Sequence, residues 1–511
     1  MKREGRTINS IRNIGAGLIN RVVLLIFPFV IRTMIIYVLG EEYLGLSSLF
    51  TSILNLLNLS ELGFGSALVY SMYRPIEENN IGQVCALLNF YKKVYHIIGC
   101  VVLGIGILLV PFLSQLIKGS YPQQINLYVL YIIYLLNTAL GYFVFAYKKA
   151  LIIAYQRNDI VSHVNSAVNI AMYVLQLIIL LVTRNYYAYV LMLPIFTIIE
   201  NVWTSIIASK QWKNIQCIGE ISKQETLEIR DHVKGIALQK ICSTSRNTFD
   251  SIVISMYLGL KAIVIYNNYF YIMSSIHSLM YLIPNAIRAS VGNSLVSSDM
   301  KKNYNDFKIF SFIYNWISIW FSVALFCLYQ PFMIIWMGND RLVPMITVSF
   351  FCLYFYELNT GDIVALYKDA AGLWWQGRYR TIIEAIANLI LNFALGKIGG
   401  MNGILLATII TSLFGGICYG GYIVYRYCFK DEALSDFINS LIMNVIVLVV
   451  TAGITYMCCQ FIVINNIYMK LLFCFGICVV VPNIVMWMAY GQLDIFKKAQ
   501  QFLLKVIKKK I

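Results

Sequence analysis

Charged residues are scarce in this chain of 511 residues, since only 13% are Asp, Glu, Lys or Arg. Soluble domains hold about 25% charged residues, so the composition excludes an ordinary soluble protein. Hydrophobic residues make up 59% of the chain, and the mean hydropathy is +0.71. The sequence therefore predicts an all-α polytopic membrane protein.

The chain also lacks the residue patterns that catalysis needs. Its four histidines, His96, His163, His232 and His277, form no metal-binding or catalytic-triad pattern. No glycine-rich loop is suited to cradle a phosphate, which argues against ATP hydrolysis. The predicted outer loops are short and leave no room for a catalytic domain such as a polysaccharide polymerase needs. We therefore expect a protein that is not an enzyme.

The twelve cysteines lack the spacing of a metal site or of a disulfide framework. Most lie inside apolar runs, where cysteine serves as a small apolar residue. We expect no metal site and no cofactor, apart from a Na⁺ or H⁺ ion that would couple transport to a gradient.

Apolar runs of about 20 residues are long enough to cross a bilayer and predict about fourteen spans. The predicted spans are 13–37, 46–70, 94–117, 126–146, 160–182, 186–208, 236–258, 263–288, 309–330, 344–366, 381–396, 401–424, 440–462 and 470–491. The run 381–396 is the weakest because glycines interrupt it, so twelve or thirteen spans are the alternative. Lys and Arg favour alternate loops by about five to one, which predicts that both termini are cytoplasmic.

The second half of the chain echoes the first at an offset of about 220 residues. The matches are Gly40 with Gly259, Pro111 with Pro331, Asn137 with Asn359, and Gln156 with Gln376. Each repeat holds six spans, an even number, so the two copies share one orientation. The predicted division is an N-lobe at 1–235, a C-lobe at 236–430, and two further helices with a basic tail at 431–511.

The first span carries two arginines, Arg21 and Arg32, although each costs roughly 2.5–3.5 kcal/mol near the middle of a membrane helix. They stand about three helical turns apart and share a face, as expected of a helix that lines a polar cavity. The repeat aligns Arg21 with Lys240, and Arg246 follows on the same span. We predict that these four cations bind an anionic group. The alternative for Arg32 and Lys240 is that they snorkel to the membrane interfaces.

Six acids fall within the predicted spans, and any of them can bind Na⁺ or take a proton. They are Glu61, Glu200, Asp250, Glu357, Asp362 and Glu384. The main candidate for ion coupling is Glu357, because oxygen ligands cluster in YELNTGD and Gly361 offers a place for the helix to break. Asp250 and Glu61 are further candidates. The alternative is an internal ion pair, as between Asp250 and Arg246 one turn away.

The N-terminal basic segment, YLGL at 43–46 and SELGFGSALVYSMYRP at 60–75 are similar to the start of a known family. The chain resembles the Wzx-type polysaccharide repeat-unit flippases of the MATE-like (MOP) exporter superfamily. The resemblance covers essentially the whole chain and implies two six-helix lobes followed by two C-terminal helices. Lipid II flippases are related, with a cationic cavity lined by helices 1, 2, 7 and 8.

The resemblance implies a multi-pass protein of the bacterial cytoplasmic membrane that moves undecaprenyl-diphosphate-linked oligosaccharide to the outer leaflet. Such carriers work by alternating access and serve capsule, O-antigen or exopolysaccharide synthesis. The implied partners are membrane lipids and the polymerase and glycosyltransferases of the pathway, with no nucleic acid. The alternative is a cation-coupled MATE-type multidrug exporter. That class is expected to line its cavity with acids, whereas the lead helices here are basic.

Overall fold

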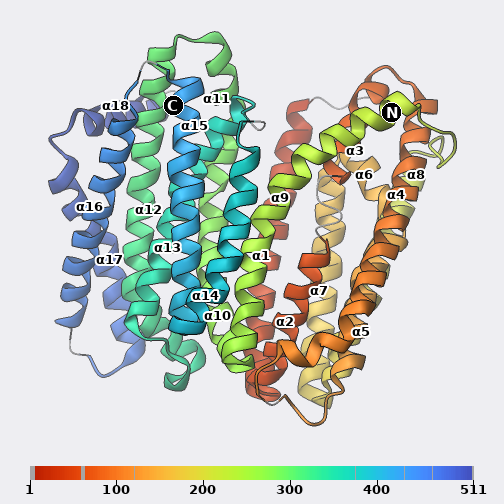
Figure 1. Ribbon diagram of the computed structural model, residues 1–511, viewed down its shortest axis with the longest axis horizontal. Coiled ribbons are helices and arrows are strands. Elements are labelled where there is room, and N and C mark those ends of the chain that lie inside the picture. The colour runs from red at the N-terminus through yellow and green to blue at the C-terminus, as the bar shows by residue number, and fades with distance from the viewer. Residues whose placement is uncertain are drawn as a thin grey trace. The chain divides into compact units, whose positions relative to one another are not determined.

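The computed structural model of the chain describes residues 6–58, 64–119, 121–373, 376–430, 432–462 and 464–508 (Figure 1). Every regular element within these ranges is a helix, and the described residues form no strand. The chain divides into two compact units, Met1–Val264 and Ile265–Ile511. The three-part division made from the sequence stays a prediction.

The first unit contains α1 (Arg6–Val38), α2 (Glu41–Leu57), α3 (Phe64–Glu77), α4 (Ile81–Leu109), the 3₁₀ helix η2 (Val110–Leu116), α5 (Leu127–Phe143), α6 (Tyr147–Ala154), α7 (Asn158–Thr183), α8 (Tyr186–Gln211) and α9 (Lys223–Leu258). Within this unit, α7 packs against α1 and α8, α5 packs against α4 and α8, and α9 packs against α2 and α3. The helix α10 (Leu260–Met280) begins near the end of the first unit and continues into the second unit.

The second unit continues with α11 (Leu282–Ser297), α12 (Met300–Met337), the 3₁₀ helix η3 (Asn339–Arg341), α13 (Met345–Ala370), α14 (Arg378–Thr411), the π-helix η4 (Ser412–Tyr419), α15 (Gly420–Cys428), α16 (Leu434–Gln460), α17 (Ile467–Tyr490) and α18 (Asp494–Lys508). The long helix α12 packs against α13, α16, α17 and α18 and so forms the centre of this unit.

The helices follow the order of the predicted spans. Among the described residues, eight helices are long and apolar enough to cross a membrane, and the bent pair α5 and α6 makes a ninth. The remaining predicted spans fall on α2 and α3, on α9, on α10 and α11, and on α13. The prediction of an all-α polytopic membrane protein is therefore confirmed, and the helix order accommodates about fourteen spans.

The weakest predicted span, 381–396, is one arm of a helical hairpin. Gly400 lies inside α14 with a φ of 57° and a ψ of −133°, which reverses the chain there. The two arms then run side by side, since Asn388 on the first arm donates from Nδ2 to Thr408 Oγ1 at 3.1 Å on the second. The predicted spans 381–396 and 401–424 are therefore separate helical segments on either side of Gly400.

The predicted helix break at Gly361 is wrong. The helix α13 runs without interruption from Met345 to Ala370. The neighbouring polar side chains bond back onto their own helix, as Asn359 Nδ2 donates to Phe355 O at 2.7 Å and Thr360 Oγ1 donates to Tyr356 O at 3.0 Å. Their hydrogen bonds are thus satisfied within a regular helix, and nothing there requires the chain to unwind.

The hairpin turn makes a testable prediction. A Cβ atom on Gly403 would overlap the carbonyl oxygen of Leu395, a backbone atom that cannot move aside. We expect Gly403→Ala to cost about 1–3 kcal/mol of stability through overpacking. The measurement is the thermal unfolding midpoint of the purified protein in detergent. The matched control is Gly399→Ala, because a Cβ there meets no atom within 4 Å. Equal midpoints for both variants would contradict the tight turn.

Candidate functional site

A cavity of about 1010 Å³ in the first unit lies among α2, α3, α4, α5, α6 and α8. This is the upper end of the size of ligand pockets, about 300–1,000 Å³. The polar residues that line it are Thr51, Asn55, Asn58, Tyr73, Tyr91, Tyr95, Tyr134, Asn137, Thr138, Tyr142, Lys149, Thr197, Glu200 and Asn201. Polar side chains are costly within a membrane and tend to serve function there, so their gathering from six helices marks the cavity as a candidate functional site.

Amide side chains dominate one part of the lining and are held in place by neighbouring hydroxyls. Thr197 Oγ1 donates to Asn137 Oδ1 at 2.7 Å, which joins α8 to α5. Tyr142 OH donates to Asn58 Oδ1 at 2.9 Å, which joins α5 to the end of α2. Each of these amides keeps its NH₂ group as a donor for a ligand. The arrangement is suited to the hydroxyl groups of sugars.

Tyrosines form a second part of the lining. Tyr91 OH donates to Tyr95 OH at 2.7 Å, and the Tyr95 ring meets the Tyr142 ring edge-on with centroids 5.6 Å apart. Tyr134 OH donates to Ser47 Oγ at 2.9 Å. Tyrosine offers a flat apolar face together with a hydroxyl. These four tyrosines are buried, at 3–6% exposed, and their hydroxyls are hydrogen-bonded within the protein, so they fix the shape of the cavity wall.

The two charged residues among the described lining residues neutralise one another. Lys149 Nζ on α6 lies 3.3 Å from Glu200 Oε1 on α8, and Asn165 Nδ2 on α7 donates to the same oxygen at 3.1 Å. The bend of 49° between α5 and α6 separates the helix that carries Lys149 from α5. The cavity therefore carries no net charge from its described lining, and it offers a cationic ligand no unpaired carboxylate.

Two of the four cations predicted to bind an anion can be placed. Arg21 and Arg32 are half-buried on α1. Neither is among the described residues that line the polar cavity, here called the amide cavity. The side chains of Lys240 and Arg246 on α9 lie outside the described part of the structure. The anion site stays a prediction.

The predicted coupling acids fall into different settings. Glu61 lies outside the described residues, and Asp250 on α9 is fully buried. Glu357 on α13 is 5% exposed and accepts a hydrogen bond from Ser412 Oγ at 2.7 Å. Ser412 begins the π-helix η4, an irregularity that often occurs at functional sites. A buried carboxylate beside a hydroxyl oxygen keeps Glu357 suitable for a proton or Na⁺.

A second carboxylate on α13 has a partner that the sequence did not reveal. Asp362 Oδ2 lies 3.0 Å from His277 Nε2 on α10 and accepts from Tyr314 OH on α12 at 3.3 Å. Glu357 and Asp362 are five residues apart and point roughly 140° away from each other around the helix. His277 was missed because its partner is 85 positions away in the sequence, and no local spacing connects them.

Together these features define a polytopic helical membrane protein with an uncharged polar cavity inside one bundle and buried carboxylates inside the other. No protein-family model matches the chain, and no curated protein matches it. Solved structures do match. The lipid II flippase MurJ in an inward-closed conformation matches with a TM-score of 0.68 and 17% identity, over 95% of this chain and 99% of MurJ.

Two transporters of the MOP superfamily also match. An inward-facing multidrug resistance MATE family transporter has a TM-score of 0.58 and 14% identity, over 80% of this chain and 96% of its own. A Pyrococcus furiosus transporter, for which reversed polarity of the binding pocket suggests a different function, has a TM-score of 0.54 and 14% identity, over 83% and 97%. The chain thus has the fold of these transporters. Identities this low establish the fold alone, so the lining residues must carry the argument about function.

The Lys149–Glu200 pair can be tested directly. We expect Glu200→Gln and Lys149→Met each to lower stability by about 1 kcal/mol, because each leaves one charge unpaired in the cavity. The double variant should lose less than the two single losses combined. Thermal unfolding of the unaltered protein, the two single variants and the double variant gives the coupling energy between Lys149 and Glu200. The control is the same set of variants at the exposed pair Lys93 and Glu220, which should show almost no coupling energy. Strictly additive losses at Lys149 and Glu200 would contradict their pairing.

Proposed function

We propose that this chain is a flippase that carries undecaprenyl-diphosphate-linked oligosaccharide repeat units across the bacterial cytoplasmic membrane. The observation that carries the proposal is the cavity of about 1010 Å³ in the first unit, lined by amides and tyrosines with its charges paired. Amides present donors and acceptors together, as the hydroxyls of a sugar chain require. The fold that the chain shares with a lipid II flippase over 95% of its length can house a carrier of this kind.

In this proposal the diphosphate binds to the cations of the lead helices, Arg21, Arg32, Lys240 and Arg246. Arginine suits the task because its planar guanidinium forms two parallel hydrogen bonds to a phosphate. The sugar chain occupies the amide cavity, and the isoprenoid tail stays in the bilayer. Alternating access then exposes the head group to the outer side. The partners would be the glycosyltransferases that build the unit and the polymerase that consumes it.

Coupling to a Na⁺ or H⁺ gradient is assigned to the buried carboxylates. Glu357 is the main candidate because it is buried, lies beside the Ser412 hydroxyl and contacts the π-helix η4. Asp250 and Glu61 remain further candidates. Asp362 joins them, since His277 and Tyr314 hold it within a buried network. A carboxylate that alternates between proton or sodium and its protein partners can bias which state the carrier adopts.

A MATE-type multidrug exporter is the second candidate because its fold also matches. The lining of the cavity opposes this role. A cationic drug needs a carboxylate free to receive it, whereas Glu200 already accepts from Lys149 and Asn165.

The cationic site predicts a specific loss of transport. Arg21→Ala and Arg246→Ala, expressed at normal levels, should each reduce export of the cognate polymer in a deletion strain by about tenfold or more, equivalent to about 1.4 kcal/mol. Arg21→Lys should lose less, because it keeps the charge and gives up only the bidentate geometry. The control is Arg184→Ala, an exposed residue at the C-terminus of α7. Full export by both alanine variants would overturn the proposed anion site, and drug resistance without polymer export would favour the second candidate.

The coupling role predicts a response to ion gradients. In vesicles that carry the purified protein, translocation of the lipid-linked substrate should slow when the sodium or the proton gradient is collapsed. The Glu357→Gln variant should transport slowly from the start and should not respond when either gradient is collapsed, because a neutral amide lacks the charge that holds Na⁺ or H⁺. Asp340→Asn, an exposed residue of η3, is the matched control and should respond like the unaltered protein. Unaltered transport after both gradients collapse would remove the coupling role.

A further inference from the structure

The short helix α18 follows a membrane helix almost directly. The helix α17 is long and apolar enough to cross a membrane and ends at Tyr490, and α18 begins at Asp494. The four residue steps between them reach at most about 14 Å, so α18 begins at the membrane surface where α17 leaves the bilayer. The charge bias of the loops predicts that this surface is the cytoplasmic one.

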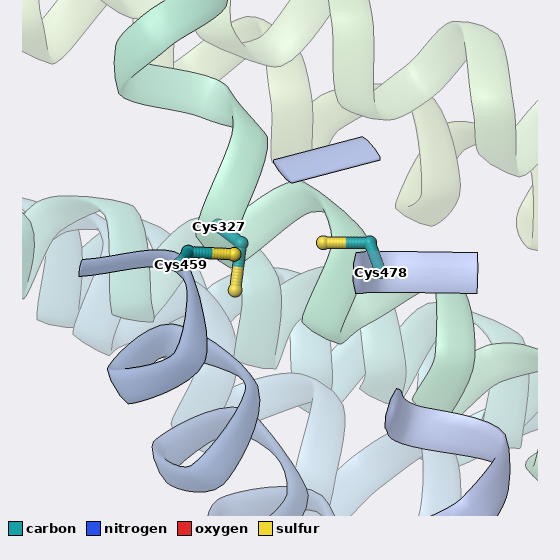
Figure 2. Close-up of side chains that lie close together, drawn as sticks. All are labelled: Cys327, Cys459 and Cys478. Carbon is teal, nitrogen blue, oxygen red and sulfur yellow. The ribbon is translucent and has the colours of Figure 1, made fainter. Parts of the chain in front are cut away.

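The helix that carries α18 is joined to its neighbours along its length. Near the end that leads to α18, Trp316 Nε1 on α12 donates to Asn483 Oδ1 on α17 at 2.9 Å. Towards the opposite end, the buried thiols of Cys327, Cys459 and Cys478 pack together from α12, α16 and α17, with their Sγ atoms within 4.8 Å of one another (Figure 2). The start of α18 is therefore held in place against α12 through α17.

One face of α18 packs on the first half of α12. The Phe496 ring lies 5.7 Å from the Trp316 ring and the Phe502 ring lies 5.4 Å from the Phe310 ring, measured between centroids. Ala499, midway between the two phenylalanines, is 3% exposed. Residues three apart share one side of a helix, so these contacts define a single apolar face that is turned towards α12.

The opposite face of α18 is basic. Lys497, Lys498 and Lys505 are exposed and fall within an arc of about 100° around the helix. The one acid in the sequence of α18 is Asp494, in the first turn, where a carboxylate complements the helix dipole. Lys498 Nζ lies 3.5 Å from Asn305 Oδ1, in the turns of α12 that precede the predicted span 309–330. The lysines thus lie outside the hydrocarbon, at the level of the lipid headgroups.

Two large apolar residues of α18 are exposed beside the lysines. Leu503 and Leu504 are 46% and 50% exposed, although the helix packs on α12. A helix with a basic face next to exposed leucines is suited to the membrane–water interface, where the leucines enter the acyl region and the lysines stay among the headgroups. A soluble polyanion, such as nucleic acid, would bind the lysines but leave the leucines in water. The surface therefore favours a lipid partner.

We propose that α18 lies in the membrane–water interface and binds the headgroups of anionic phospholipids through Lys497, Lys498 and Lys505. Leu503 and Leu504 enter the acyl region of the same leaflet. Each lysine near an anionic membrane surface favours binding about fivefold, so three lysines favour it about a hundredfold, and salt weakens the attraction. The site is independent of the transport function proposed above, because it needs neither the amide cavity nor the cations of the lead helices.

The test is hydrogen–deuterium exchange of the full-length protein in nanodiscs of phosphatidylcholine, with or without about a third of phosphatidylglycerol. We expect the amides of 494–508 to exchange at least about tenfold more slowly with phosphatidylglycerol, because a bound helix opens less often. A variant that combines Lys497→Gln, Lys498→Gln and Lys505→Gln should lose this difference. Leu503→Ser combined with Leu504→Ser should speed exchange in both lipids.

The matched control removes three exposed lysines of the first unit, through Lys210→Gln, Lys213→Gln and Lys223→Gln, and should keep the full difference. An equal loss in this control would show a general effect of net charge and overturn the proposal. Equal exchange of the unaltered protein in the two lipids would also overturn it. So would the same slowing by inorganic phosphate in phosphatidylcholine alone, which would indicate a free anion. The unaltered protein decides the last two cases, so a variant that fails to fold leaves the test valid.

Discussion

A polar side chain inside a membrane has no water to bond with, so it must find its partner in the protein. Polar side chains of the described helices meet this constraint in two ways. Some polar groups bond back to their own helix, as Asn359 does to Phe355 O. Others bond across helices, as Asn388 does to Thr408 in the α14 hairpin. The first solution leaves a helix regular, while the second fixes which helices are neighbours.

The groups that bond across helices are also the ones that can do chemistry. The amides of the first unit are fixed by hydroxyls and still present donors to a cavity, so they suit a ligand rich in hydroxyls. Asp362 accepts a hydrogen bond from Tyr314 OH and lies 3.0 Å from His277 Nε2. This partly buried acid therefore has a partner, His277, that can itself carry a proton.

Much of the fold could be predicted from the sequence, because membrane spans depend on local hydropathy. The runs of apolar residues located the helices, and even the weak span 381–396 proved to be a helix arm, with Gly400 as its turn. The candidate site was harder to predict from the sequence. Glu200 and Asp362 were recognised as intramembrane acids, but their partners Lys149 and His277 lie 51 and 85 positions away. Such pairings depend on how helices pack, and a single sequence carries no signal of it. The helix break expected at Gly361 is absent, because Asn359 and Thr360 make their hydrogen bonds within α13.

The pairing of Lys149 with Glu200 has a consequence for how a flippase of the proposed kind would recognise its substrate. A neutral cavity cannot distinguish a diphosphate from a neutral group by charge, so it can select only the sugar chain. In the proposed function, recognition of the phosphates would come from residues outside this lining, and the same unit carries Arg21 and Arg32 on α1. The pairing matters for the same proposal, because a Glu200 without Lys149 would repel an anionic substrate that entered the cavity.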